Sequence, residues 1–376
     1  MPESISPAGY TEEMSPGPPK ITGAPTSIVA FVGKLKSGPT NQPVEVTGVD
    51  DLTNKFGDPY FESARVVSQF FANGGRTAVV VRVNDANSVT EKSAAIEDGI
   101  QALDQIDRFN LLCIPAASEI EPSAFVASIS HAEQVCQQRK VFLLIDSQSS
   151  LNKPEDVLDW LKANSQLRQA SAALYFPWVK VSDGSSSARR IPPTGCVAGL
   201  IARMDENRGV WKAPSGNEAT LTDIVALDYS VSAQESDVLN RQGVNTLRDF
   251  PGVGTVCWGA RTLLPDPEWR YVPVRRLALF LEDSIDDGLQ WTVFEPNNEL
   301  LWANVRRTIE DFLFDLWKAG ALMGVTPEQA FFVKCDRTTM TQSDLDNGRL
   351  ICLVGFAPLK PAEFVILRIA RPTAES

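Results

Sequence analysis

The side chains that could perform catalysis or bind a metal are few and scattered in this sequence. His131 is the only histidine among 376 residues. On a helix predicted over 122–139, it lies about 200° around the axis from Ile129, which belongs to the apolar stripe. We therefore expect His131 to face solvent. No histidine or cysteine lies three or four residues away to share a metal ion, so the sequence predicts no metal site here.

Three carboxylates follow one another closely at Asp283, Asp286 and Asp287. Paired carboxylates can perform acid–base catalysis or bind calcium. They lie in the segment 282–288, whose composition is typical of a turn, and a solvated acidic loop is the simpler interpretation.

Glycine motifs that would bind a nucleotide are also incomplete. The segment 251–259 has glycines at 252, 254 and 259, which misses the dinucleotide-binding spacing. It precedes another apolar run instead of opening a helix. The sequence contains no phosphate loop, no H-E-x-x-H and no G-x-S-x-G. We therefore predict a protein that is not an enzyme and that uses no cofactor.

The cysteines are widely spaced and form no C-x-x-C pair. Most lie in apolar segments, which favours buried reduced thiols over metal ligands or disulfides. The six are Cys113, Cys136, Cys196, Cys257, Cys335 and Cys352.

Composition excludes several classes of protein. Hydrophobic residues make up 43% and charged residues 22%, as in soluble globular proteins. The 35 basic and 47 acidic residues give a net charge of −12, which argues against binding to nucleic acid or anionic lipid.

The first residues lack the basic and apolar pattern of a signal peptide, and no run is apolar enough for a membrane helix. We expect the chain to be made and folded in the cytoplasm, without direct membrane insertion.

The elements that would position any site alternate between strand and helix from residue 27 to residue 181. Nearly continuous apolar strands predict a sheet covered on both faces, hence an α/β domain. The expected strands are 27–33, 76–83, 109–115, 141–146 and 172–181, and the expected helices are 61–73, 91–105, 122–139 and 154–164. The segment 182–195 reads as a surface loop, followed by a helix of small residues.

A second regular region follows residue 263. Its pattern predicts a strand over 271–282, a long helix over 299–319 and three strands over 331–336, 349–358 and 363–370. This order favours an α+β domain.

The long helix has two faces. Its far side carries Arg307, Asp311 and Lys318 together with the apolar Leu300 and Phe314. Single exposed apolar side chains are common on protein surfaces. The alternative is a second contact surface against another domain or another molecule.

Both ends of the chain read as extended arms. Residues 1–26 contain six prolines, which forbid a helix, so this arm is either a loose terminus or laid on another surface. Residues 361–371 are strand-like and apolar, and an unpaired apolar edge would aggregate. The economical solution is strand donation to a neighbouring subunit. The residues expected to do so are Ile5, Tyr10, Phe364, Val365, Ile366, Leu367 and Ile369.

Read together, several long segments resemble the contractile tail sheath proteins of bacteriophages, R-type bacteriocins and related injection systems. The resemblance lies in residues 21–57, 70–75, 79–83, 209–216, 239–263, 269–302, 311–336 and 357–370. The chain is short and in one piece, so it is similar to the compact bacteriocin or extracellular injection type.

The resemblance implies stacked hexameric rings of protomers around an inner tube, held by a mesh of terminal arms. Contraction would drive the tube through a target membrane, with baseplate and terminator or cap proteins as further partners. It implies a C-terminal domain next to the tube, with Arg307, Asp311, Phe314 and Lys318 as candidate contacts to the tube or to a neighbour. The expected domains are an N-terminal arm over 1–26, an outer α/β domain over 27–262, an inner α+β domain over 263–361 and a C-terminal arm over 362–376.

Two other functions remain open from the residues. One is a noncontractile shell or binding protein with the same fold, and the other is an enzyme of doubly wound type.

Overall fold

The computed structural model describes residues 19–85, 88–182 and 187–362. The chain divides into two compact units. The first, called here the α/β unit, contains residues 24–283 and 358–362 of the described chain. The second, called here the C-terminal unit, contains residues 19–23 and 284–357.

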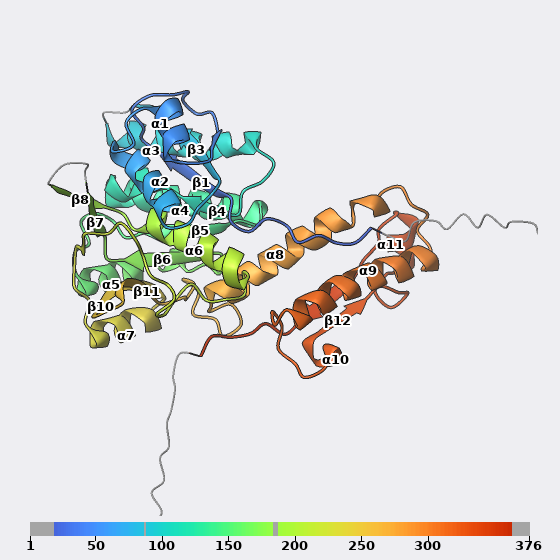
Figure 1. Cartoon of the computed structure of the whole chain (residues 1–376). Coiled ribbons are helices and arrows are strands. Elements are labelled where there is room, and N and C mark those ends of the chain that lie inside the picture. Colours follow the sequence, from blue (N-terminus) through green and yellow to red (C-terminus); the bar gives the residue numbers. More distant parts are fainter. Residues whose placement is uncertain (1–18, 86–87, 183–186, 363–376) are drawn as a thin grey trace, which may run out of the picture. The chain divides into compact units, whose positions relative to one another are not determined.

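An eight-stranded sheet forms the centre of the α/β unit (Figure 1), in the order β11-β10-β6-β5-β4-β1-β3-β2. The strands from β3 to β10 in this order pair in parallel, and the edge strands β2 and β11 are antiparallel to their neighbours. The strands are β1 (Val29–Gly33), β2 (Val44–Val46), β3 (Ala78–Arg82), β4 (Leu111–Cys113), β5 (Phe142–Asp146), β6 (Ala172–Phe176), β10 (Val244–Phe250) and β11 (Gly254–Trp258).

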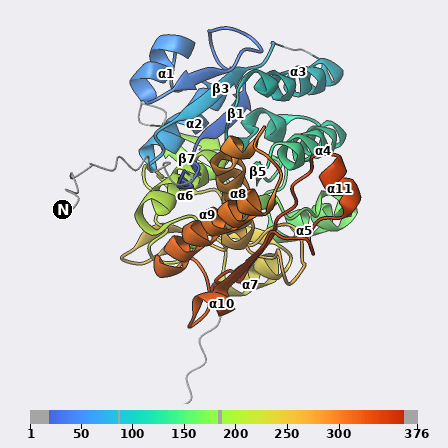
Figure 2. The same ribbon diagram turned by 90° about the vertical axis from the view of Figure 1, so that its right-hand side faces the viewer.

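Helices cover both faces of this sheet, as its apolar strands predict. Figure 2 shows α2 and α6 on one side of β1 and β5, and α3 and α4 on the other. The helices of the unit are α1 (Val49–Phe56), α2 (Glu62–Ala72), α3 (Val89–Gln101), α4 (Pro122–Gln138), α5 (Pro154–Ala163), α6 (Thr194–Arg208) and α7 (Ala233–Arg241), with short 3₁₀ turns η1 (Ala102–Gln105), η2 (Pro115–Glu119) and η3 (Ser165–Leu167).

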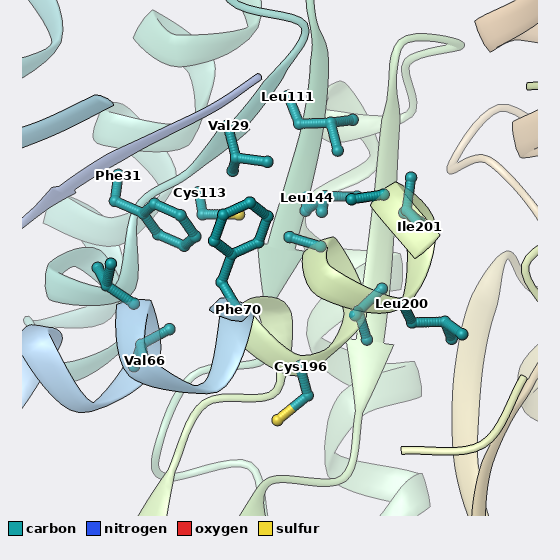
Figure 3. Packing of buried hydrophobic residues seen from close by; sticks show 14 of the residues in the cluster. Val29, Phe31, Val66, Phe70, Leu111, Cys113, Leu144, Cys196, Leu200 and Ile201 are labelled. Atoms are coloured by element: carbon teal, nitrogen blue, oxygen red, sulfur yellow. The ribbon is translucent and has the colours of Figure 1, made fainter. Parts of the chain in front are cut away.

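The two faces of the sheet hold separate cores, because successive side chains of a strand point to opposite faces. In β1, Phe31 belongs to the core under α2 and α6, whereas Val32 belongs to the core under α3 and α4. Figure 3 shows Phe70 of α2 pointing toward Phe31 and Cys113. The Phe31 and Phe70 rings meet edge to face at 5.5 Å. The predicted α/β class is confirmed here, because the parallel strands are buried on both faces.

A smaller sheet corrects the expectation of a surface loop over 182–195. It has the order β8-β7-β9, with β7 at Val179–Ser182, β8 at Ala188–Ile191 and β9 at Ala226–Leu227. The strand expected over 172–181 is in fact two strands, β6 and β7, which lie in different sheets. Polar composition hid β8, because its side chains are mostly exposed and only Ile191 is buried.

The C-terminal unit contains a long helix and a two-stranded sheet. The predicted helix over 299–319 is confirmed as α9, and two of the predicted strands are confirmed as β12 and β13. The third, over 363–370, lies outside the described residues. The elements are η4 (Gln290–Thr292), α9 (Glu299–Lys318), α10 (Pro327–Ala330), β12 (Phe331–Lys334), α11 (Gln342–Asp346) and β13 (Leu353–Phe356).

The strand predicted over 271–282 is wrong, because this segment is the first part of helix α8 (Val272–Gly288). Residues 277–281 form an unbroken apolar run, which fits a buried strand as well as a buried stretch of helix. Two signals favoured a helix: the length, which exceeds that of an ordinary strand, and Pro273 in the first turn. Asp283, Asp286 and Asp287 therefore lie on a helix and not in a turn.

The two units divide inside α8, between Asp283 and Ser284. This division lies C-terminal to the boundary expected between residues 262 and 263. The reason is that the start of α8 packs into the α/β unit, where Val272 and Leu279 join the core under α2 and α6.

Arg276 of α8 forms a buried ion pair with Asp205 of α6. The Nη1 and Nη2 atoms donate to the two carboxylate oxygens at 2.8 and 2.6 Å, and both side chains are about 95% buried, with exposed fractions of 4% and 5%. Nη2 also donates to the carbonyl of Thr26 at 2.8 Å. The guanidinium therefore joins α6, α8 and the incoming N-terminal segment within the α/β unit.

Helix α4 carries two titratable side chains that are more buried than expected. His131 is half-buried and its Nε2 atom has no hydrogen-bond partner among the described residues, so the expectation that it faces solvent is wrong. The cause is that α4 packs against α3 and η3 as well as β5, which covers more than one stripe of the helix. Glu133 is buried, and burial raises the pKa of its carboxyl to about 8.

The Arg276–Asp205 pair gives a first prediction. We expect Arg276→Met to lower the free energy of unfolding by about 3–5 kcal/mol, because it leaves a buried carboxylate uncompensated. Urea unfolding followed by circular dichroism measures this change. The control is Arg208→Met, which removes a half-exposed ion pair to Glu218 and should cost less than about 1 kcal/mol. Equal losses for the two variants would contradict the assignment.

Glu133 gives a second prediction. Its folded pKa lies above the ordinary 4.5, so the folded state holds the proton more tightly and stability falls as pH rises from about 5 to 8. We expect Glu133→Gln to remove up to about 1.4 kcal/mol of this loss per pH unit. The variant should match the parent near pH 5 and unfold at higher urea near pH 8. An advantage independent of pH would contradict a titrating Glu133.

Candidate functional site

Helix α9 is the longest element of the C-terminal unit, and its ends are specified by sequence. Asn298 caps its N-terminus, because the side-chain oxygen accepts from the Leu301 amide at 3.0 Å. Glu299 lies in the first turn and Lys318 in the last, which is the favourable arrangement for the helix dipole. The helix forms its own start and stop without help from a second chain.

One face of α9 forms the core of the C-terminal unit. Strand β12 and helix α10 contact this helix (Figure 1). The buried side chains are Leu301, Trp302, Val305, Thr308, Ile309, Phe312 and Leu313.

The opposite face carries the four residues that the sequence singles out. Arg307, Asp311 and Lys318 are exposed, and Phe314 is half-buried. The structure brings Lys318 and Phe314 together, with the Lys318 Nζ atom 4.3 Å from the centre of the ring. Within the described residues no ion pair joins Arg307 to Asp311. This face is a polar surface with one partly covered aromatic ring.

The N-terminal segment lies against the same unit, which the sequence did not reveal. Lys20 Nζ is 3.4 Å from Asp315 of α9, and both side chains are largely exposed. Ile21 is buried, and its side chain occupies the space that a Cβ at Gly288 would need. The exposed ion pair contributes little stability, so the apolar Ile21 contact holds the segment.

Strands β12 and β13 form a two-stranded antiparallel sheet with Phe331 opposite Phe356 and Lys334 opposite Leu353. Phe332 covers Gly355, since a Cβ there would lie 2.1 Å from the ring. Each strand pairs on one side only among the described residues, so each offers free backbone donors and acceptors on the other. Such edges can accept further strands.

The predicted arm residues cannot be placed on this sheet. Ile5, Tyr10 and the run from Phe364 to Ile369 lie outside the described residues. Lys360, near the last described residue, donates from Nζ to the carbonyl of Pro267 at 3.1 Å.

Leu300 is exposed on the far face of α9, as the helical wheel predicts, and large apolar side chains outside this helix, which the wheel does not cover, are exposed as well. Phe294 is fully exposed and has a positive φ of 72°, which is strained for a non-glycine residue. Leu300, Val325 and Phe332 are also more than half exposed. The signal was a phenylalanine in a polar loop before Pro296. Several large apolar side chains of this unit are therefore exposed in the single chain.

The α/β unit has the strand order of a doubly wound nucleotide-binding fold, in which ligands bind beyond the carboxyl ends of the central strands, between β1 and β4. Here the chain's own residues fill that position. A Cβ at Gly33 would lie 2.4 Å from Ser63 Oγ and 3.5 Å from Pro115.

A buried carboxylate at the end of β5 is likewise used for structure. Asp146 accepts from the amide of Thr194 at 2.9 Å and from its hydroxyl at 2.7 Å, which fixes the start of α6. Burial raises the pKa of Asp146 to about 7.

Searches for other chemistry give two findings for the described parts of the chain. No three His, Cys, Asp or Glu side chains come together as metal ligands would. No helix there has both the length and the apolar character needed to cross a lipid bilayer.

Three tail sheath families match consecutive parts of the chain. The Gp18 domain III N-terminal region matches residues 26–83, the phage tail sheath central domain matches 92–263 and the phage tail sheath C-terminal domain matches 265–370.

Curated relatives are phage tail sheath proteins. The tail sheath protein of Escherichia phage P2 is 24% identical over 387 aligned residues, covering 95% of this chain and 93% of the relative. The tail sheath protein of Vibrio phage KVP40 is 25% identical over 190 residues, and the chain spans only 27% of that longer relative.

Solved sheath structures match over nearly their whole length. The helical sheath of the anti-feeding prophage in its contracted state is 30% identical, with a TM-score of 0.80, over 98% of this chain and 100% of the other. The contracted sheath complex of the extracellular contractile injection system PVC is 28% identical, with a TM-score of 0.79, over 99% of both chains. These matches confirm the resemblance seen in the sequence, and the chain belongs to the phage tail sheath protein family.

Proposed function

We propose that this chain is the structural subunit of a contractile sheath. Its protomers stack as hexameric rings around an inner tube, and contraction drives the tube through a target membrane. The observation that carries the proposal is the full-length likeness to an anti-feeding prophage sheath in the contracted state. The chain would be assembled in the bacterial cytoplasm as part of a phage tail or tail-like particle.

The proposed partners are other protomers, the inner tube, the baseplate and the terminator or cap proteins. The likeness to a chain in the anti-feeding prophage baseplate, 29% identical with a TM-score of 0.78, supports the baseplate as a partner. The net charge of −12 argues against nucleic acid.

The two-stranded sheet of the C-terminal unit is the proposed acceptor of arms from neighbouring protomers. At about 0.5–1.5 kcal/mol per net hydrogen bond, a donated strand contributes a few kcal/mol in each protomer. The hydrogen bonds of a donated strand can persist while the protomers change how they pack against one another. Protomers can therefore move without separating. We propose the following arrangement in the sheath. The arms are residues 1–26 and 362–376, the domain next to the tube is 263–361, and the domain on the outside of the sheath is 27–262.

Electron microscopy tests the proposal directly. Purified chain combined with tube and baseplate should form hollow cylinders that shorten on triggering. Monomers alone, or shells that never shorten, would contradict it.

Deleting residues 2–20 or 364–376 tests the arms. We expect each deletion to prevent stable sheath formation, because the ladder between protomers is lost. The α/β unit should remain folded, since its cores lie within residues 24–283. Micrographs of each truncation with tube and baseplate give the result, and circular dichroism gives the control. Sheaths of normal length from both deletions would refute the arm mesh.

Charge reversal on α9 tests the proposed tube contact. We expect Arg307→Glu with Lys318→Glu to reduce tube co-assembly at least tenfold, a total loss of about 1.4 kcal/mol or more for the two changes together. The matched control is Arg76→Glu with Lys162→Glu, which reverses two exposed cations of the α/β unit. Co-sedimentation with tube measures the difference. If both pairs behave alike, this face does not bind the tube.

A further inference from the structure

Two cysteines flank the paired strands of the C-terminal unit. Cys335 directly follows β12 and Cys352 directly precedes β13. The last pair of the ladder is Lys334 opposite Leu353, so continuing the antiparallel register by one residue sets Cys335 opposite Cys352. Directly opposite residues in such a ladder have Cβ atoms about 4.5–5.5 Å apart, close to the separation that a disulfide requires.

The two thiols are in contact. A hydrogen bond joins the side chains of Cys335 and Cys352, and both cysteines are reduced. Cys335 is buried and Cys352 is half-buried, so a reagent in solution reaches Cys352 first. The remaining four cysteines are buried in the cores of the α/β unit.

The contact makes the two thiols chemically unequal. The hydrogen bond from Cys352 lowers the pKa of Cys335, and the positive charge of Arg306 acts in the same direction. The same hydrogen bond, together with burial, raises the pKa of Cys352. The thiolate, which is the nucleophile, therefore forms first on Cys335.

We propose that Cys335 and Cys352 form a reversible dithiol–disulfide couple that staples β12 to β13 when a low-molecular-weight disulfide such as glutathione disulfide is present. In the first step the more accessible Cys352 gives its proton to the adjacent Cys335 thiolate, bonds through its sulfur to one glutathione sulfur and releases the other glutathione as its thiolate. In the second step Cys335, having passed that proton to the released thiolate, attacks the Cys352 sulfur and releases the second glutathione. The two cysteines are oxidised, one disulfide is reduced to two glutathiones, and the two protons pass to the released thiolates.

The staple would act on the loop between β12 and β13, which contains α11. Cross-linking this loop restricts the unfolded chain, so it stabilises the folded sheet. This consequence extends the proposed function, because the same sheet is the proposed acceptor of neighbouring arms. The chemistry itself does not depend on that role, so the two can fail separately.

Intact-mass analysis of the folded chain incubated with glutathione disulfide tests the couple. We expect the parent to lose two hydrogens and to yield a single cross-linked peptide containing Cys335 and Cys352. Cys335→Ser should instead retain one glutathione on Cys352, because the attacking thiolate is missing. Cys257→Ser, which removes a buried core thiol, should form the disulfide like the parent.

Thermal unfolding gives a second readout for these variants. The oxidised parent should show a higher thermal midpoint than the reduced parent, whereas Cys335→Ser should show no such difference between the two conditions. Glutathione that stays on Cys352 in the parent, or a cross-link between other cysteines, would overturn the proposal. Failure of sheath assembly with the disulfide intact would bear on the proposed function alone.

Discussion

A buried ion pair between Arg276 and Asp205 is the interaction on which the path of the chain depends. The chain passes between its two units near Gly23, inside α8, and near Ala357. Arg276 binds Asp205 and the carbonyl of Thr26 at once, so it fixes the α/β-unit ends of two of these passages. An apolar side chain could fill the space but could not orient a backbone carbonyl. The contacts among Arg276, Asp205 and the Thr26 carbonyl therefore fix how α8 and the N-terminal segment are oriented within the α/β unit. Their cost is the free energy of burying two charges.

The two units are stabilised in different ways. The α/β unit is closed: its sheet has apolar cores on both faces, and its crevice between β1 and β4 is filled by Ser63 and Pro115. The C-terminal unit has a small core on one face of α9. Among the described residues, the outer edges of its strands β12 and β13 are unpaired. In the part of the chain that the structure describes, both strands of the smaller unit therefore have an edge open to a further strand.

The sequence predicted those elements whose signal lies within the element itself. Strand β3 is a run of valines, and α9 has an N-cap residue and an apolar stripe at the helical period. Helix α8 was predicted as a strand because its unbroken apolar run over 277–281 fits either element. The ladder of β10 and β11 was not predicted, because the segment 251–259 was considered only as a nucleotide-binding motif. The opposition of Cys335 and Cys352 depends on a register that crosses α11, and no spacing rule gives it.

The open edges and the exposed apolar side chains of the C-terminal unit have one physical meaning. An unpaired backbone edge and a strained, fully exposed Phe294 are both features that contact with another molecule can cover. Backbone strand pairing and side-chain contacts respond differently when two subunits move relative to one another. A backbone ladder keeps its hydrogen bonds when the attached bodies rotate, whereas side-chain contacts such as those of Phe294 must be exchanged. A subunit that has to change its packing without leaving its neighbours needs the first kind to hold it and the second kind to store the difference between two states.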